Sequence, residues 1–589
     1  MSHPLKHLAL VGIGLTTGSF SVETRFTDAE LAALDPVRAA ETVCGGQRVG
    51  SVLTAQLLIA SAQAAPISEA ASMPLYPDLA NSPFPVTTGN NQARRYFSQG
   101  LLLNYGFNHS GAVRSFRQAQ RLDPNCAMCW WGEALALGPN INAPMDDRDR
   151  DAALTAMDRA MALRFKASPL ERALIEAVAL RYSRDPAADR AVLDAAYADA
   201  MLKVAHRFPA DDDVAVLAAE AAMDTTPWNY WEPDRKTPIG LSGAALRLVE
   251  AVLARNPSHV QAGHLAIHLL EASDPQRAEG AADRLARPIA PSAAHLVHMP
   301  GHIFYARGRY ADSMRVNVAA ARADEAYLRT AGDSGLVRYG YYPHNIHFIV
   351  TSAQMAGDMA TAIREAQRLR TILSPETSAK IAWIQAIDAA PFFAMAQFAA
   401  PEDILALPAP DARLPYARAM WHYARSVAHA VRQDGAAFDA EMQEIDTLAK
   451  APALDAMVAQ GMPVHDLLAL AQAVARGRLA VLSGRHDEAI AHYRKAVGIE
   501  SKIPYQEPPY WYYPVRQSLG AALFLAGRHD EASQVFREAL VQSPRNGWAL
   551  FGLARSEAAR GNKLEAAAAR RAFSKVWLGE QNWPQMERL

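Results

Sequence analysis

The hexapeptide GRHDEA occupies residues 484–489 and returns letter for letter at residues 527–532, and a diverged copy, GNKLEA, occupies residues 561–566. Each copy begins with a glycine suited to a helix end and continues into a segment with apolar residues at helical spacing. The last two glycines are 34 positions apart, a period typical of paired-helix repeats. The pattern predicts antiparallel helix pairs that bury their apolar faces by stacking on one another.

The first two copies are 43 positions apart, and most of the surplus is the insert PYQEPPY at residues 504–510. Pro544 should end the helix before the next pair, because proline lacks the N–H that would continue it. Residues 548–554 then read as the first helix of that pair. The repeats are therefore expected to continue almost to the last residue of the sequence.

Related units occur earlier in the chain, at residues 112–124, 306–313 and 355–358. Over most of residues 90–580 the sequence resembles the tetratricopeptide repeat family. The resemblance implies an all-α fold in which helix-turn-helix repeats stack as one continuous superhelix, an α-solenoid. It also implies a general association with protein partners.

The chain divides by composition and by the strength of its repeats. The middle segments are helical in composition but carry little repeat signature. The expected parts are a leader with a candidate signal peptide at 1–64, a linker at 65–90, an N-terminal repeat-like helical region at 91–360, an irregular helical region at 361–475, and C-terminal repeats at 476–589.

The composition narrows the classes of function. Among 589 residues, 61 acidic side chains nearly balance 59 basic ones, and no basic stripe stands out, so nucleic acid is not an expected partner. Phosphate-binding glycine loops and serine-hydrolase elbows are absent from the sequence. Three cysteines cannot build a disulfide scaffold; Cys126 and Cys129 are expected to form a local disulfide or two packed thiols.

The N-terminal segment carries the marks of export. Residues 49–64 are apolar and small, follow Arg48 and end in Ala62-Gln63-Ala64, as a signal peptide with an A-x-A cleavage site does. The segment lies far from Met1, which an early start assignment would explain. The expected location is periplasmic or secreted, and otherwise cytoplasmic. No later segment is long and apolar enough to predict a membrane span.

Eight of the 18 histidines lie between residues 259 and 347. Three short motifs contain most of them, each with a spacing that places its members near one face of a helix: GHLAIHLLE at 263–271, HLVHMPGH at 295–302 and YPHNIH at 342–347. Pro300 should kink the second helix. Neighbouring helices of a repeat array could bring the three stripes together.

Imidazoles with a carboxylate favour a divalent transition metal such as zinc, iron, copper or manganese. His259 is off the stripe and is expected at the surface. The predicted ligands are His264, His268, His298 and His302, followed by Glu271, His295, His344 and His347 as further ligands or orienting partners.

Two classes of function remain open. The first is an exported metalloprotein, including a metal-dependent enzyme of unidentified reaction, with a small molecule as its ligand. The second is a non-catalytic scaffold that holds a peptide or protein in its concave groove. Aromatic clusters at residues 228–231 and 510–513 are expected to pack between helices or to line a groove. Asn104, Glu133, Arg307, Asn317 and Asp324 could complete a pocket, but they are expected as caps or solvated polar residues.

Overall fold

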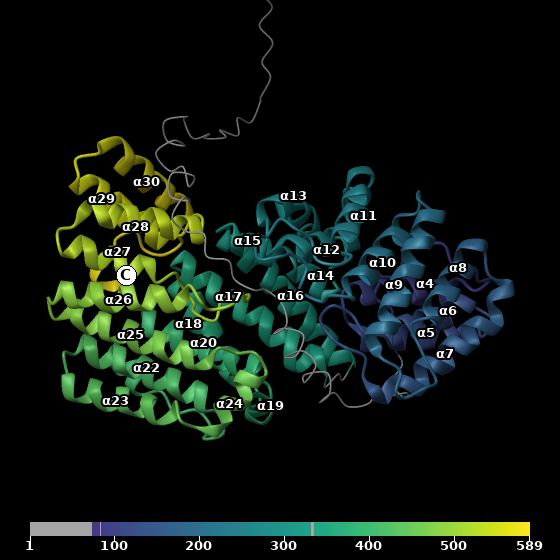
Figure 1. Ribbon diagram of the computed structural model, residues 1–589, viewed down its shortest axis with the longest axis horizontal. Helices are drawn as coiled ribbons and strands as arrows, with labels where there is room; N and C mark the ends of the chain where they lie inside the picture. The colour runs from purple at the N-terminus through teal and green to yellow at the C-terminus, as the bar shows by residue number, and fades with distance from the viewer. Residues whose placement is uncertain (1–72, 83, 332–334) are drawn as a thin grey trace, which may run out of the picture.

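The computed structural model describes residues 73–82, 84–331 and 335–589, and these residues are almost entirely helical (Figure 1). Apart from two isolated β-bridges, the described residues contain no strand. The leader at 1–64 lies outside the described residues. The helices are α4 (Asn91–Tyr105), α5 (His109–Leu122), α6 (Ala127–Ala136), η1 (Asp147–Asp149), α7 (Arg150–Leu163), η2 (Arg164–Lys166), α8 (Pro169–Ala179), α9 (Arg190–Arg207), α10 (Asp212–Met223), α11 (Ser242–Arg255), α12 (Val260–Leu270), α13 (Pro275–Leu285), α14 (Ala294–His298), α15 (Pro300–Ala306), α16 (Tyr310–Ala331), the π-helical turn η3 (Val337–Tyr341), α17 (Tyr342–Ala356), α18 (Met359–Ile372), α19 (Pro375–Lys380), α20 (Ala382–Phe398), α21 (Pro401–Leu405), α22 (Pro415–Val431), α23 (Gly435–Leu448), α24 (Pro452–Ala459), α25 (Val464–Leu482), α26 (His486–Glu500), α27 (Arg516–Leu525), α28 (His529–Gln542), α29 (Gly547–Ala559), α30 (Lys563–Val576) and η4 (Met586–Arg588).

The C-terminal repeats form the predicted helix pairs, α25 with α26, α27 with α28 and α29 with α30. The turn glycine of the middle pair, Gly527, has a φ of 77°, a left-handed conformation that costs a residue with a β-carbon about 1–2 kcal/mol. Gly484 and Gly561 adopt the same conformation at the equivalent turns. The helix before Pro544 ends at Gln542, as expected. The all-α solenoid predicted from the repeat period is therefore confirmed.

Two hydrophobic cores hold the helices together. One is formed by buried residues between Met73 and Tyr341, and the other by buried residues between Tyr305 and Leu589. In Figure 1 the helices α4–α14 gather on one side and α18–α30 on the other, with α16 and α17 between them. The two cores meet at α15 and α16, which lie between the second and third histidine motifs or carry part of them, whereas α12 lies within the first core.

The C-terminal repeats return to the middle of the chain instead of leading away from it. A β-carbon on Gly308, in the turn before α16, would lie 1.5 Å from the carbonyl oxygen of Pro544 in the turn before α29. The indole N–H of Trp548 donates a hydrogen bond to the carbonyl oxygen of Gln354 on α17 at 3.0 Å. The backbone N–H of Leu578 donates to the carbonyl oxygen of Ala356, also on α17, at 2.8 Å. This contact brings the insert between α26 and α27 toward the histidine motifs.

The structure also decides the predictions made for the cysteine pair and for His259. Cys126 and Cys129 form the local disulfide, at the start of α6. His259 was expected at the surface, and this is wrong for its side chain: it caps the N-terminus of α12, lies 3.5 Å from Asp213 and is only 7% exposed. Among the described helices, none combines the length and apolar character that crossing a membrane requires.

Candidate metal centre

Helix α12 presents the first histidine stripe to the interior. His264, His268 and Glu271 are each at most 3% exposed. Their spacing of four and three residues places them on one side of the helix. The Nδ1 atom of His264 lies 3.0 Å from Oε1 of Gln261, and that of His268 lies 3.1 Å from Oε1 of Glu271. Both imidazoles are thus held by an oxygen at Nδ1.

The second stripe is broken at Pro300, as the sequence predicted. Helix α14 ends at His298 and α15 begins at Pro300, whose missing N–H is tolerated in a first helical turn. His298 and His302 still face each other across the break, with their Nε2 atoms 2.7 Å apart. His295, one turn earlier, lies with its ring centroid 5.0 Å from that of His264 and 5.8 Å from that of His298.

Hydrogen bonds fix which nitrogen of His298 and His302 carries a proton. Nδ1 of His298 lies 2.6 Å from Oδ1 of Asn317, whose amide N–H donates to the carbonyl oxygen of Ser313 at 2.8 Å. Nδ1 of His302 lies 2.5 Å from Oε2 of Glu271. Because both Nδ1 atoms face acceptors, both must donate, and the two Nε2 lone pairs point at one another. A cation, either a proton or a metal ion, is needed between them.

Helix α17 supplies the third motif only in part. The ring of His344 lies 4.9 Å from that of His298 and 5.8 Å from that of His302. His347 is also buried, but it belongs to none of the histidine and carboxylate groups that converge in the described part of the chain. Because His347 follows His344 by three residues, its side chain leaves the helix in a direction about 60° away from that of His344. The structure therefore brings His344 into the cluster and leaves His347 beside it.

Three sets of ligand atoms converge, with all atoms of a set within 4.8 Å of one another. Two are trihistidine groups and the third contains two carboxylates. His302 belongs to two of these sets, and it can offer Nε2 to one ion while its Nδ1–H donates to a carboxylate. The groups are His264, His268 and His295; His298, His302 and His344; and Glu271, His302 and Glu507.

Glu507 is the residue that the sequence analysis missed. It lies in the insert 504–510, 160 residues after His347, the last residue of the nearest histidine motif. Its Oε2 atom is 3.1 Å from Nδ1 of His302, its side chain is 6% exposed, and Tyr505 donates a hydrogen bond to its Oε1 atom. The available signal was the insert itself, a Pro- and Tyr-rich extension that a plain repeat does not need.

Burial dominates the electrostatics of the cluster. It lowers the pKa of His264, His268, His295, His298 and His344 well below the usual value, and neighbouring imidazoles lower it further. These side chains are neutral and can act as ligands. His302 is the exception.

Burial also lowers the pKa of His302, but the carboxylates of Glu271 and Glu507 outweigh it and raise the pKa to about 10. Burial raises the pKa of Glu507, which His302 opposes. Without a metal ion, His302 therefore carries the proton that lies between the two facing Nε2 atoms. The site is built to hold a positive charge at that point.

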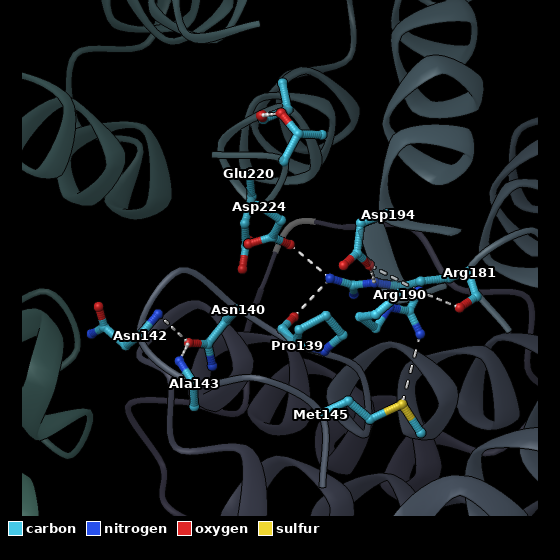
Figure 2. A network of polar contacts seen from close by, with 12 residues as sticks. Pro139, Asn140, Asn142, Ala143, Met145, Arg181, Arg190, Asp194, Glu220 and Asp224 are labelled. Atoms are coloured by element: carbon cyan, nitrogen blue, oxygen red, sulfur yellow. Dashed lines mark hydrogen bonds and ion pairs between the residues drawn. The ribbon is translucent and has the colours of Figure 1, made fainter. Parts of the chain in front are cut away.

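A second polar network lies behind His264. The amide N–H of Gln261 donates to Oε2 of Glu220 at 3.0 Å, which turns its carbonyl oxygen toward His264. Burial raises the pKa of Glu220 to about 7, against the opposing charge of Arg181. Arg181 itself donates to Asp224 at 2.6 Å and to the carbonyl oxygen of Pro139 at 2.7 Å (Figure 2). This network fixes the orientation of one imidazole from outside the cluster.

Several polar residues expected as caps or solvated groups are buried. Asn317 is fully buried against His298, and Asp324 is 3% exposed and accepts a hydrogen bond from Asn345 at 2.7 Å. Asn104 is 2% exposed. The expectation was wrong for these three, because α4 and α16 are covered by neighbouring helices. It was wrong for Glu133 too, which is 4% exposed and pairs with Arg117 at 2.6 Å, whereas the half-buried Arg307 pairs with Glu279 at 3.3 Å.

Comparisons with solved structures find only distant likeness. The TPR domain of P58(IPK) shares 15% identity with this chain over 59% of it and 90% of that domain, with a TM-score of 0.20. The human IFIT1 dimer with m7Gppp-AAAA shares 11% identity over 81% of this chain and 95% of that one, with a TM-score of 0.29. The APC/C hetero-tetramer Cut9-Hcn1 shares 12% identity over 85% and 95%, with a TM-score of 0.24. At these scores the superpositions carry no argument.

Family models give the clearer result. Models described as tetratricopeptide repeat match residues 474–503 and residues 514–556. No curated protein matches the sequence. The matched segments contain α26, α27 and α28, the helices whose turns carry the repeated hexapeptide. At these two segments the chain carries tetratricopeptide repeats.

Proposed function

We propose that this chain is a metalloprotein whose centre binds two divalent transition-metal ions, one at each trihistidine group. The observation that carries the proposal is the pair of Nε2 atoms of His298 and His302, 2.7 Å apart, with both Nδ1 atoms committed to oxygen acceptors. Metal-binding histidines characteristically donate their other N–H to a carboxylate or carbonyl oxygen. This is the arrangement of His298 and His302, and also of His268 with Glu271.

A purely structural role for these histidines explains the geometry less well. Nε2 of His268, both ring nitrogens of His295 and Nδ1 of His344 have no hydrogen-bond partner among the described residues. An unsatisfied buried polar group costs about 1–3 kcal/mol. One proton on His302 cannot satisfy nitrogens in both trihistidine groups. Two bound cations, one at each trihistidine group, would satisfy one nitrogen of each of these imidazoles, which favours a metal centre over a packed core.

The donor set suits zinc, iron or copper, since neutral imidazoles and carboxylates are ligands for all three. Three protein ligands leave a coordination position open, as in catalytic sites rather than structural ones. When bound, such an ion supplies Lewis-acid or redox chemistry to a molecule that reaches the open position. The protein's own contribution is to orient the imidazoles through Gln261, Glu271 and Asn317.

Elemental analysis of the purified, metal-supplemented protein tests the proposal. We expect about two metal ions per chain, with about one lost in His268→Ala and one in His298→Ala. His422→Ala is the matched control, because His422 is also buried and held at Nδ1 by a carboxylate, that of Glu441 at 2.6 Å. A wild-type protein without stoichiometric metal, or a control that loses as much as the two variants, would refute it.

The second candidate function is a scaffold for a protein or peptide. The tetratricopeptide repeats at 474–503 and 514–556 favour it, because stacked helix pairs present extended binding surfaces. In this chain α25 and α27 are contacted by η4, and Ser518 donates a hydrogen bond to the carbonyl oxygen of Leu589. A partner would have to displace this segment or bind elsewhere. A pull-down in which partner capture is indifferent to the metal-site variants would support the scaffold.

Export of the protein to the periplasm or the exterior remains part of the proposal. The disulfide between Cys126 and Cys129 supports it, because structural disulfides persist mainly in oxidising compartments. Cell fractionation of the full-length protein tests it. Recovery in the cytoplasmic fraction with both thiols reduced would contradict it.

A further inference from the structure

One carboxylate serves both trihistidine groups, of which the first contains His264, His268 and His295 and the second His298, His302 and His344. Oε1 of Glu271 lies 3.1 Å from Nδ1 of His268, and its Oε2 lies 2.5 Å from Nδ1 of His302. The side chain of Glu271 is only 1% exposed, so both contacts are shielded from water. The two groups therefore meet at a single buried side chain.

Two amide oxygens near the centre are each directed at one group. Oε1 of Gln261 lies 3.0 Å from Nδ1 of His264, in the first group, and Oδ1 of Asn317 lies 2.6 Å from Nδ1 of His298, in the second. Each of these amides orients one imidazole. Glu271 differs from them because it has two acceptor oxygens and offers one to each group.

The geometry of a carboxylate links these two contacts. Its two oxygens lie in one rigid plane and must move together. His268 lies on α12, which ends just before Glu271, whereas His302 lies on α15. A movement of His268 that turns the carboxylate therefore also moves the acceptor that orients His302. Because such acceptors determine the orientation of metal-binding imidazoles, the disturbance reaches the second group.

We propose that Glu271 couples the two metal positions, so that a change at the histidines of one trihistidine group alters the affinity of the other group for its ion. The inference rests on the proposed metal centre and adds a means of regulating how the centre is loaded. Coupling between two binding sites is reciprocal, so the effect must be measurable in both directions.

Two variants of the first group provide the test. His268→Ala and His264→Ala each remove one ligand of that group and should each lose its ion. They differ because His268 contacts Glu271, whereas His264 is held by Gln261. In a Co²⁺ competition titration, we expect the remaining ion to bind about tenfold more weakly to His268→Ala than to His264→Ala, because loss of an orienting contact typically weakens metal binding about 10- to 100-fold.

The reciprocal pair is His302→Ala and His344→Ala, in which the ion of the first group is measured. His302 contacts Glu271, whereas His344 packs against His298 with 4.9 Å between ring centroids. The His302 variant should bind the remaining ion more weakly by a similar factor. This second pair also answers the question if a variant of the first group does not fold.

Glu271→Gln, added to each variant of the first pair, is the control. Glutamine has about the same size but one acceptor oxygen instead of two, so it cannot orient both imidazoles, and the difference between the paired variants should disappear. The absorption spectrum of bound Co²⁺, recorded on the same samples, reports the geometry of the remaining ion, which a general loss of stability would not change.

The possible results separate the coupling from the metal centre itself. Wild-type protein that binds Co²⁺, with equal affinities within each pair of variants, would overturn the coupling alone. A difference that persists after Glu271→Gln would overturn the role of Glu271. Wild-type protein that does not bind Co²⁺ would overturn the metal centre and the coupling with it.

Discussion

Replacing Asn317 by leucine removes the acceptor that orients His298 while leaving every proposed metal ligand in place. Asn317 is fully buried, and its Oδ1 atom lies 2.6 Å from Nδ1 of His298. Leucine has a similar size but cannot accept a hydrogen bond. The imidazole would then be free to change tautomer or to turn away from His302.

The expected magnitude follows from these contacts. Loss of an orienting partner typically weakens metal binding about 10- to 100-fold, which corresponds to about 1.4–2.8 kcal/mol. The metal-free protein should also lose about 1–3 kcal/mol of stability, because the Nδ1–H of His298 stays buried without an acceptor. The assay is a competition titration of Co²⁺ against a chromophoric chelator, together with thermal unfolding of the metal-free form.

Asn546→Leu provides the control for general damage. Asn546 is also fully buried, and it caps α29 by accepting hydrogen bonds from Trp548 and Ala549. Its replacement should cost about 0.5–2 kcal/mol of stability and leave metal affinity unchanged. Equal Co²⁺ affinity in wild type and Asn317→Leu, or equal weakening in both variants, would refute the reasoning.

Three further outcomes are expected. Glu507→Gln should weaken metal binding about tenfold, because His302 loses one of its two carboxylate partners. An unchanged affinity in the Co²⁺ titration would show that Glu507 plays no part in the centre. Gly308→Ala should lower the stability to thermal unfolding by about 1–3 kcal/mol more than Gly527→Ala does. Both glycines have a positive φ, but only a β-carbon at position 308 would collide with Pro544. Equal losses in the two variants would contradict this close approach. Burial raises the pKa of Asp388 to about 7, so the folded protein binds a proton at this carboxyl more tightly than the unfolded chain does. The resulting contribution to folding stability is present at low pH and is lost as the pH rises through 7. Asp388→Asn should leave the stability near pH 4 unchanged and raise it above pH 7 by about 1–3 kcal/mol, measured by denaturant unfolding at both pH values; a constant difference would contradict the assignment.

The repeats could be predicted from the sequence because their signals are local. A left-handed turn such as that at Gly527 selects glycine, and the helix pair around it fixes the spacing of the apolar residues. The histidine stripe of α12 and the one that runs from α14 into α15 were also visible, since four-residue spacing determines which side chains share a face of a helix.

What the sequence could not provide were contacts made across the fold. Glu507 reaches His302 only because the C-terminal repeats return to α15–α17, and that return depends on the fit of Gly308 against Pro544. Asn317 lies on α16, and its position in the helical pattern is equally compatible with an exposed polar residue. Its burial against His298 depends on which helices cover α16. Periodicity describes one helix at a time and contains no information on which distant segment covers it.

X-ray absorption spectroscopy of the metal-loaded protein tests the central claim most directly, because it reports the atoms bound to the metal without requiring any variant. We expect a coordination shell dominated by imidazole nitrogen, at about 2.0–2.1 Å for zinc. A shell of oxygen atoms alone, or one containing sulfur, would contradict the assignment of the two trihistidine groups.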